Sequence, residues 1–178
     1  MQPTWSASGD RIAYWLQGAE GLSLMTISAD GTGEAVVVLE AKSDLIDPEW
    51  SHDGRYLVYG ERSAETGFDI RYVELEADGS ASEPVTFLAT PANEQAPKIS
   101  PDGRFLAYSS DESGRLETYV RPFPGGDGKW QASVDGGSSP RWSRKARSWL
   151  RARTIHSVAA AGGGRPLLLK YSTVHGCA

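Results

Sequence analysis

The sequence lacks the residues from which compact metal and redox centres are usually built. It has a single cysteine, Cys177, which excludes an internal disulfide. Its three histidines, His52, His156 and His175, lie far apart, and no His or Cys spacing is typical of a zinc site. A calcium loop of the Asp-x-Asp-x-Asp-Gly type is also missing. We therefore expect no metal ligands and no cofactor.

Long apolar runs are missing too. None approaches the ~20 residues of a transmembrane helix, so we expect no membrane span. The start of the sequence has neither a basic segment nor an apolar one after it, and we expect no signal peptide there. With 39% hydrophobic residues, 10% aromatics and 20 glycines, the 178-residue chain has the composition of a turn-rich globular domain.

The signatures of common enzymes do not occur. A serine hydrolase needs a Gly-x-Ser-x-Gly elbow with Asp and His downstream, whereas residues 136–140 read GGSSP and are expected in a loop. There is no phosphate-binding loop and no kinase signature. We therefore expect no catalytic residues in this chain and no enzymatic activity of its own.

Acidic residues are missing from the last part of the chain. Up to Pro140 there are ten basic and 23 acidic residues, and from Arg141 onward there are eight basic residues and no acidic ones. Residues 141–153 combine six Lys or Arg with two tryptophans, a pattern that also occurs in segments that bind nucleic acid or anionic membranes. A basic tail without such a partner is the simpler interpretation, and we expect no nucleic acid partner.

What the sequence does contain is a repeated phrase. PKISPDGRFLAY, at residues 97–108, recurs as PEWSHDGRYLVY at residues 48–59 and more loosely as PTWSASGDRIAY at residues 3–14. A broken fourth copy begins with PRWS at residues 140–143. The prolines that open the four copies are 45, 49 and 43 residues apart. Repeats of this length are typical of β-propeller blades.

Each copy combines a turn with a strand. Proline fixes φ, aspartate caps the turn and glycine adopts the left-handed conformation without a steric penalty. The strand that follows is apolar on both faces, which suits packing between neighbouring blades. A tryptophan two residues after the proline would fill the space between blades and stabilise the fold by roughly 2–3 kcal/mol. The residues expected to build the repeats are Trp5, Trp50, Asp53, Gly54, Tyr59, Asp102, Gly103, Tyr108 and Trp142.

These patterns predict an all-β chain that forms a partial β-propeller. Residues 1–145 contain three recognisable antiparallel blades, at about residues 3–42, 48–90 and 97–138, and the start of a fourth at residue 140. In blade one we expect strands at residues 11–16, 22–27 and 35–39. Residues 61–62 and 111–112 are expected in loops at one end of the propeller, where propellers commonly bind ligands.

Residues 146–178 are expected to form a divergent, basic and irregular tail. Two explanations stay open for it. The tail is either a natural, disordered extension or the product of translation out of frame. Suitable codons for residues 145–149 (AAG GCA AGG AGC TGG) read Gly-Lys-Glu-Leu in another frame, which is the sequence that a blade would have at this point.

The repeats resemble those of known propellers. WSHDGR at residues 50–55 and SPDGR at residues 100–104 resemble the blade signature of TolB-type, WD-repeat-like β-propellers. YVRPFPGG at residues 119–126, followed by residues 130–131 and 140–143, resembles the propeller of bacterial receptor-type serine/threonine kinases. That propeller follows the kinase domain and a membrane helix. The resemblance covers residues 3 to about 145 and implies a ring of six or seven blades, of which this chain would be a fragment.

The resemblance implies a non-enzymatic propeller segment that binds a protein or a small ligand across the loops at one end. The first interpretation is the sensor part of a receptor-type kinase. The alternatives are a TolB-like periplasmic interaction propeller and the gating propeller of a prolyl-oligopeptidase-type hydrolase that lacks its catalytic domain. A kinase or TolB-like parent would place the chain in the periplasm or outside the cytoplasm.

Two contact surfaces are also expected. The proline-rich turn with Arg121 and Phe123 either contacts a partner or only closes a blade. The open faces of the outermost blades would be covered by the remaining blades of a longer chain or by self-association.

Overall fold

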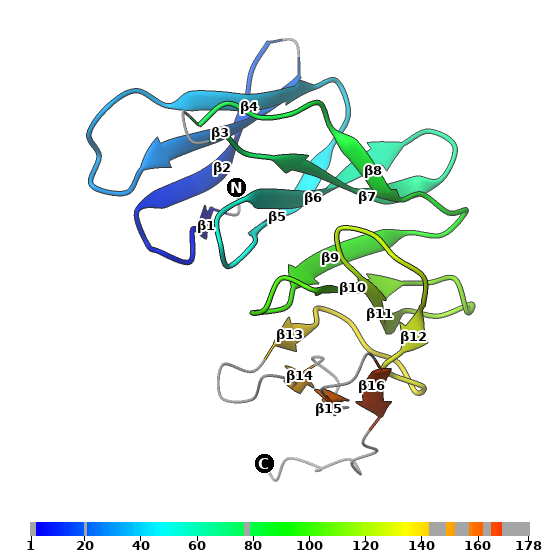
Figure 1. Ribbon diagram of the computed structural model, residues 1–178. Coiled ribbons are helices and arrows are strands. Elements are labelled where there is room, and N and C mark those ends of the chain that lie inside the picture. Colours follow the sequence, from blue (N-terminus) through cyan, green and yellow to red (C-terminus); the bar gives the residue numbers. More distant parts are fainter. Residues whose placement is uncertain are drawn as a thin grey trace, which may run out of the picture.

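The computed structural model describes residues 3–19, 21–76, 79–142, 149–151, 157–161 and 165–168. This part of the chain is entirely β, with four antiparallel sheets of four strands each and no helix. The sheets follow one another in sequence order and lie side by side along a curved path (Figure 1). The predicted all-β class with antiparallel blades is confirmed.

Each sheet is one blade, and its strands are ordered as in the sequence. Blade 1 consists of β1 (Thr4–Trp5), β2 (Arg11–Gln17), β3 (Leu22–Ser28) and β4 (Val36–Ala41). Blade 2 consists of β5 (Leu45–Trp50), β6 (Tyr56–Ser63), β7 (Gly67–Glu74) and β8 (Val85–Leu88). Blade 3 consists of β9 (Glu94–Ile99), β10 (Phe105–Ser110), β11 (Glu117–Pro122) and β12 (Trp130–Gln131).

Blade 4 begins at the fourth copy of the repeat. It consists of β13 (Arg141–Trp142), β14 (Trp149–Arg151), β15 (Ser157–Ala161) and β16 (Arg165–Leu168). Most of the tail expected at residues 146–178 lies outside the described residues. In its described backbone, β14 pairs with β13, β15 pairs with β14, and β16 pairs with β15.

The first strand of each blade lies beside the first strand of the next. Strand β5 contacts β1 on one side and β9 on the other, and β9 also contacts β13. We call β1, β5, β9 and β13 the inner strands. The later strands of each blade spread outward from them, as in a propeller (Figure 1).

The repeated turn is held by the aspartate and glycine that the sequence singles out, together with the serine that precedes them. In blade 2 the Ser51 hydroxyl accepts the amide N–H of Tyr56 at 2.8 Å and donates to the Asp53 carboxylate. Asp53 also accepts the N–H of Arg55 at 3.1 Å. Burial raises the pKa of Asp53, but these hydrogen bonds outweigh it and lower the pKa below its usual value. Gly54 follows with a φ of 73°, which glycine adopts without strain.

Blade 3 repeats this arrangement. Ser100 accepts the N–H of Phe105 at 3.0 Å and donates to Asp102 at 2.6 Å, and Gly103 again has a φ of 73°. The tyrosines that follow on β6 and β10, Tyr59 and Tyr108, are fully buried, and burial raises the pKa of both phenols.

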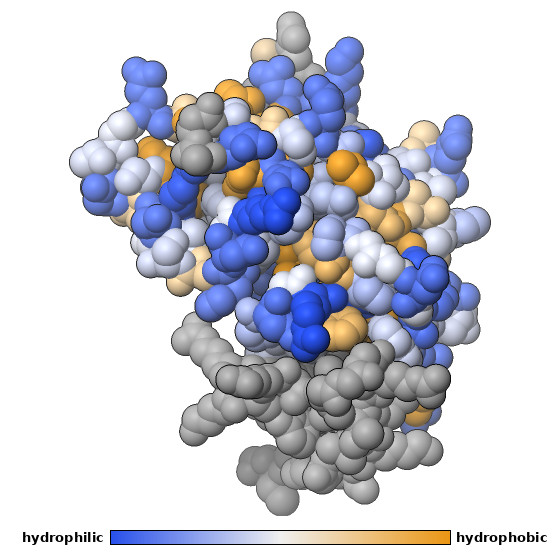
Figure 2. Space-filling view, in the orientation of Figure 1, coloured by the Kyte–Doolittle hydropathy of each residue, from blue (hydrophilic) through white to orange (hydrophobic). Residues whose placement is uncertain are grey.

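Apolar side chains fill the spaces between blades rather than one central core. Between blades 1 and 2 the cluster includes Trp15, Leu24, Trp50, Leu57 and Tyr59. Between blades 2 and 3 it includes Val58, Ile70, Leu106, Tyr108 and Phe123. On the face drawn in Figure 2, apolar residues appear as separate spots among polar ones.

The repeated tryptophans join adjacent inner strands. The indole N–H of Trp50 donates to the carbonyl oxygen of Thr4 at 3.3 Å, and Trp142 makes the same contact with Lys98 at 2.8 Å. Trp50 is 7% exposed, whereas Trp5, at the same place in blade 1, is 57% exposed. The difference follows from packing, because no described blade covers that side of blade 1.

Candidate functional site

The two ends of the propeller segment differ in their loops. One end carries the turns between the first and second strands, which have the sequence Ser-x-Asp-Gly in blades 2 and 3. The other end carries the β2–β3, β6–β7 and β10–β11 hairpins and the connections that lead into β5 and β9. We call this second end the hairpin end. A pocket opens at the hairpin end.

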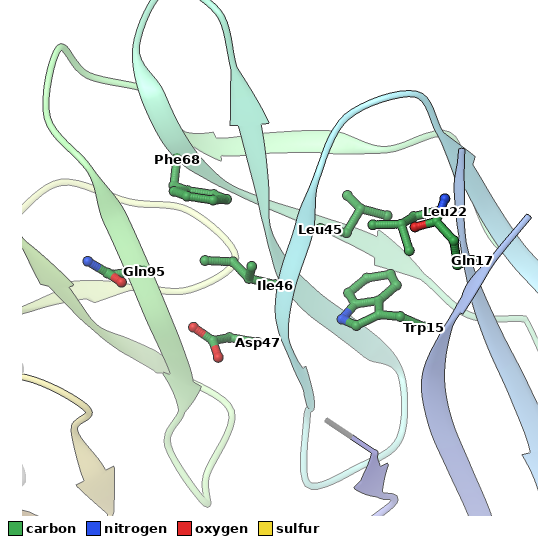
Figure 3. Close-up of a pocket in the computed structure, with 8 residues that line it drawn as sticks. All are labelled: Trp15, Gln17, Leu22, Leu45, Ile46, Asp47, Phe68 and Gln95. Carbon is green, nitrogen blue, oxygen red and sulfur yellow. The ribbon is translucent and has the colours of Figure 1, made fainter. Parts of the chain in front are cut away.

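The pocket has a volume of about 600 Å³ and takes its walls from three blades (Figure 3). Strands β2 and β3 of blade 1, β5 and β7 of blade 2, and β9 of blade 3 contribute to it. Most of the lining is apolar, with a few polar groups, which is typical of sites that bind organic ligands. The lining residues are Trp15, Gln17, Leu22, Leu45, Ile46, Asp47, Phe68 and Gln95.

Asp47 reaches the pocket because β5 bulges. Its φ is 50°, and Ala96 and Ser139, which also stand directly before a repeated proline, have φ values of 53° and 54°. The pairing of β5 with β6 shifts between Ile46 and Glu49, so the bulge contains Asp47 and Pro48. A bulge turns a side chain away from its regular direction and leaves backbone groups unpaired. It also explains how an inner strand accommodates proline.

The bulges connect two blades. The N–H of Ala96 in blade 3 donates to the Oδ2 atom of Asp47 in blade 2 at 3.1 Å. Among the described residues, no hydrogen bond reaches the Oδ1 atom of Asp47. The carboxylate is therefore fixed through one oxygen and has the other available to the pocket.

Trp15 forms the blade 1 side of the pocket. Its side chain is 6% exposed and meets the ring of Tyr59 edge to face, with centroids 6.1 Å apart. The indole Nε1 is buried and has no hydrogen-bond partner in the described part of the chain. Figure 3 shows this nitrogen on the side of the ring that faces Ile46 and Asp47. A buried N–H without an acceptor is unfavourable, so this position favours a ligand that offers one.

Apart from Asp47, the charged residues of the hairpin end do not line the pocket. Glu61 accepts hydrogen bonds from Ser43 at 2.8 Å and from Arg71 at 2.6 Å. Residues 61–62 were expected in a loop, but they lie in β6. That expectation was wrong because β6 and β7 stay paired up to the Ser63–Gly67 pair. The Glu61–Arg71 pair braces the blade 2 hairpin.

The other expected loop pair does lie in a turn. Asp111 accepts the N–H of Asn93 at 2.9 Å and its side-chain amide at 3.0 Å, and these bonds lower the pKa of Asp111. The Asn93 amide oxygen in turn accepts the N–H of Phe68 at 3.4 Å. Glu112 pairs with Lys129 at 2.6 Å. This network fixes blade 3 against blade 2 below the pocket wall formed by Phe68.

A buried acid lies near this network. Glu94, the first residue of β9, is fully buried, and burial raises its pKa to about 7. Thr90 donates a hydrogen bond to Oε1, while Oε2 has no partner among the described residues. The equivalent position of blade 2 is occupied by Leu45, which is 5% exposed. Blade 3 thus carries a carboxyl where blade 2 carries an apolar side chain.

The proline-rich turn lies far from the pocket. Phe123 is 5% exposed and packs against Tyr56, Tyr72 and Phe87, with ring centroids 5.2, 5.3 and 5.6 Å away. Phe123 therefore belongs to the packing between blades 2 and 3, and its contact with a partner stays a prediction. Arg121 is half-buried in β11, and its contact with a partner stays a prediction.

The pocket residues could not be recognised beforehand. Trp15 lies outside the repeated phrase, and Asp47 precedes it. The left-handed residue before each proline has no sequence signal, since Asp, Ala and Ser occupy the three positions. Within the described ranges, no group of three His, Cys, Asp or Glu is placed to hold a metal ion. No helix in the same ranges is long and apolar enough to cross a membrane.

Comparison with known proteins supports the propeller interpretation. No family model matches the chain. The Tol-Pal system protein TolB of Bordetella pertussis is 29% identical over 159 aligned positions, which cover 66% of this chain and 36% of that protein. TolB of Francisella tularensis is 31% identical over 94 positions, which cover 51% of this chain and 20% of that protein. The chain thus spans about a third or less of the curated relatives that it matches.

Solved structures agree. A putative TolB from Agrobacterium tumefaciens superimposes with a TM-score of 0.69 and 16% identity, over 92% of this chain and 62% of that one. The fold is that of a TolB-like β-propeller. Crystalline puromycin hydrolase is also similar, with a TM-score of 0.66 and 17% identity over 89% of this chain and 28% of that one. TolB-like blades therefore occur both in TolB and within a larger hydrolase.

Proposed function

We propose that this chain is a non-enzymatic, protein- or ligand-binding segment of a TolB-like propeller, and that it binds at the hairpin end. The observation that carries the proposal is the pocket, whose lining comes from blades 1, 2 and 3. Such a site exists only while the blades are packed together. The blades would then act as a rigid scaffold, and the inner strands would present the binding groups.

The parent protein that we favour is a TolB-like interaction propeller. It is supported by the sequence similarity to TolB proteins in two bacterial genera. A second candidate is the sensor part of a receptor-type serine/threonine kinase, which is supported by the residues at 119–126. A third candidate, the gating propeller of a hydrolase, is supported by the similarity to puromycin hydrolase.

The three parents differ in what flanks the chain, so reading the gene on both sides distinguishes them. A signal peptide alone upstream would support the TolB-like parent. A kinase domain and a membrane helix upstream would support the sensor, and a hydrolase domain downstream would support the gating propeller. The same reading across codons 140–178 would decide between a natural tail and a change of frame.

Binding at the hairpin end is tested by photocrosslinking in cells that make the protein. The change is Phe68→p-benzoylphenylalanine, which keeps an aromatic ring at the pocket wall. The control carries the same group in place of Val85, which is 42% exposed on the outer strand β8. We expect defined protein adducts from position 68 that position 85 does not form. Identical adducts at both positions, or none at position 68, would refute protein binding at this end.

A further inference from the structure

We propose that the pocket binds an amphipathic organic amine, with its cationic amino group at Asp47 and a hydrogen-bond acceptor at the indole N–H of Trp15. The apolar body of the ligand would lie against the walls between these two groups. The inference rests on the proposed function and adds to it the chemical class of the ligand. A short peptide with a free amino terminus belongs to this class.

The hydrogen-bond acceptor of the proposed ligand is inferred from Trp15. Its Nε1 donor is buried, faces the pocket and lacks a protein partner among the described residues (Figure 3). An indole nitrogen only donates, so it selects ligands that carry a carbonyl, ether or hydroxyl oxygen at that point. A purely hydrocarbon ligand would leave the donor unpaired and would be discriminated against.

The cationic end follows from the charges around Asp47. The eight lining residues include one carboxylate and no Lys, Arg or His. The nearest basic group on β9, Lys98, already pairs with Glu49. Burial raises the pKa of Glu49, and of the charges nearby Lys98 and Arg141 lower it while Asp47 raises it. None of these cations lines the pocket beside Asp47. An ammonium group of a ligand would pair with this carboxylate and hydrogen-bond to its Oδ1 atom.

The middle of the pocket determines what kind of ligand body fits between the two polar groups. Leu22 and Leu45 stand on the Trp15 side, and Ile46 and Phe68 stand between Trp15 and Gln95 (Figure 3). Gln95 lies on the same side as the carboxylate and offers both a donor and an acceptor. A volume of about 600 Å³ suits an organic molecule of di- or tripeptide size.

The test follows the indole N–H resonances of the whole chain by NMR while the dipeptide amide Phe-Leu-NH₂ is added. The signal of Trp15 is identified by its loss in Trp15→Phe, which keeps an aromatic wall. We expect the Trp15 signal to shift selectively among those of the six tryptophans. The N-acetylated dipeptide lacks the cation and should bind at least about tenfold more weakly.

Two variants separate the groups. Asp47→Asn keeps an acceptor for the N–H of Ala96 but loses the negative charge. It should therefore weaken the binding of Phe-Leu-NH₂ by about tenfold. Trp15→Phe should weaken the binding of Phe-Leu-NH₂ several-fold. This binding is followed by the remaining amide signals, because the indole signal of Trp15 is lost. Glu83→Gln removes one exposed charge away from the pocket and should change nothing. Amide spectra of each variant show whether the fold is kept.

Each other outcome overturns the proposal. Equal binding of the acetylated dipeptide, or unchanged binding in Asp47→Asn, would exclude the cationic end. A Trp15 signal that does not move at about 10 mM dipeptide, far above the Kd expected for such a site, would exclude this ligand class. Crosslinks at position 68 would still support binding at the hairpin end in that case, so the two proposals fail separately.

Discussion

Replacing Glu94 with leucine should stabilise the chain, and the gain should grow with pH. Glu94 is fully buried at the junction of blades 2 and 3, and its Oε2 atom has no partner in the described part of the chain. The negative charges of Asp69 and Glu112 add to the effect of burial, so its pKa is raised from 4.5 to about 7. Leu45 shows that the repeat accepts leucine at this position.

The magnitude follows from the pKa shift. Below about pH 4.5 the carboxyl is protonated in both the folded and the unfolded chain, and it causes no penalty. As pH rises, the unfolded chain ionises first, so the free energy of unfolding falls until the folded carboxyl also ionises near pH 7. At 1.36 kcal/mol per pKa unit, the loss between these values is about 3 kcal/mol.

The assay is urea unfolding of the wild type, Glu94→Gln and Glu94→Leu between pH 4.5 and pH 8, followed by circular dichroism. Both variants should lack this pH-dependent loss, and their advantage over the wild type should increase by about 3 kcal/mol across the range. Glu83→Gln, at an exposed site, serves as the control. A constant difference between wild type and variants at all pH values would refute a raised pKa at Glu94.

Three further predictions concern the packing between blades, the left-handed backbone at Ala96 and self-association. Trp50→Ala should destabilise the chain by about 3–5 kcal/mol in thermal or urea unfolding. Trp5→Ala, at the exposed equivalent position, should cost less than ~1 kcal/mol. Equal effects of the two substitutions would contradict the packing assigned to these rings. Ala96→Gly should stabilise by about 0.5–1 kcal/mol because the residue has a φ of 53°, and a loss of stability would show that this backbone is not left-handed in solution. The isolated chain should self-associate in light scattering, since Trp5 and Leu16 are 57% and 43% exposed on blade 1, and a monodisperse monomer would contradict this.

The repeated phrase was informative because its chemistry is local. Ser51, Asp53 and Gly54 form their turn with hydrogen bonds that span a few residues, so the sequence alone predicts the turn and the strand after it. The strand expected at residues 11–16 is observed as Arg11–Gln17. Local order of this kind repeats from blade to blade and allowed the fold to be predicted.

The inner strands and the pocket could not be predicted in this way. Strands β5 and β9 contain proline, which usually argues against a strand, and only the bulges at Asp47 and Ala96 reconcile the two. The pocket joins Trp15 to Gln95, and no local pattern links residues so far apart in sequence. The sequence predicted that ligands bind at loops that contain residues 61–62 and 111–112, and these positions lie towards the hairpin end. The residues that line the pocket, however, come from strands.

The tryptophan contacts between neighbouring inner strands have a further consequence, for hydrogen exchange. Trp50 ties blade 2 to blade 1, Trp142 ties blade 4 to blade 3, and Asp47 joins blade 2 to Ala96 of blade 3. Among the described blades, an inner blade is therefore held on both sides and the first is held on one. Amide protons of β6 and β10 would then exchange most slowly, and those of β2 sooner, as opening spreads inward from the first blade. A molecule seated between Trp15 and Asp47 would fasten that first blade to the second. It would slow exchange in β2 and β3 without altering their conformation.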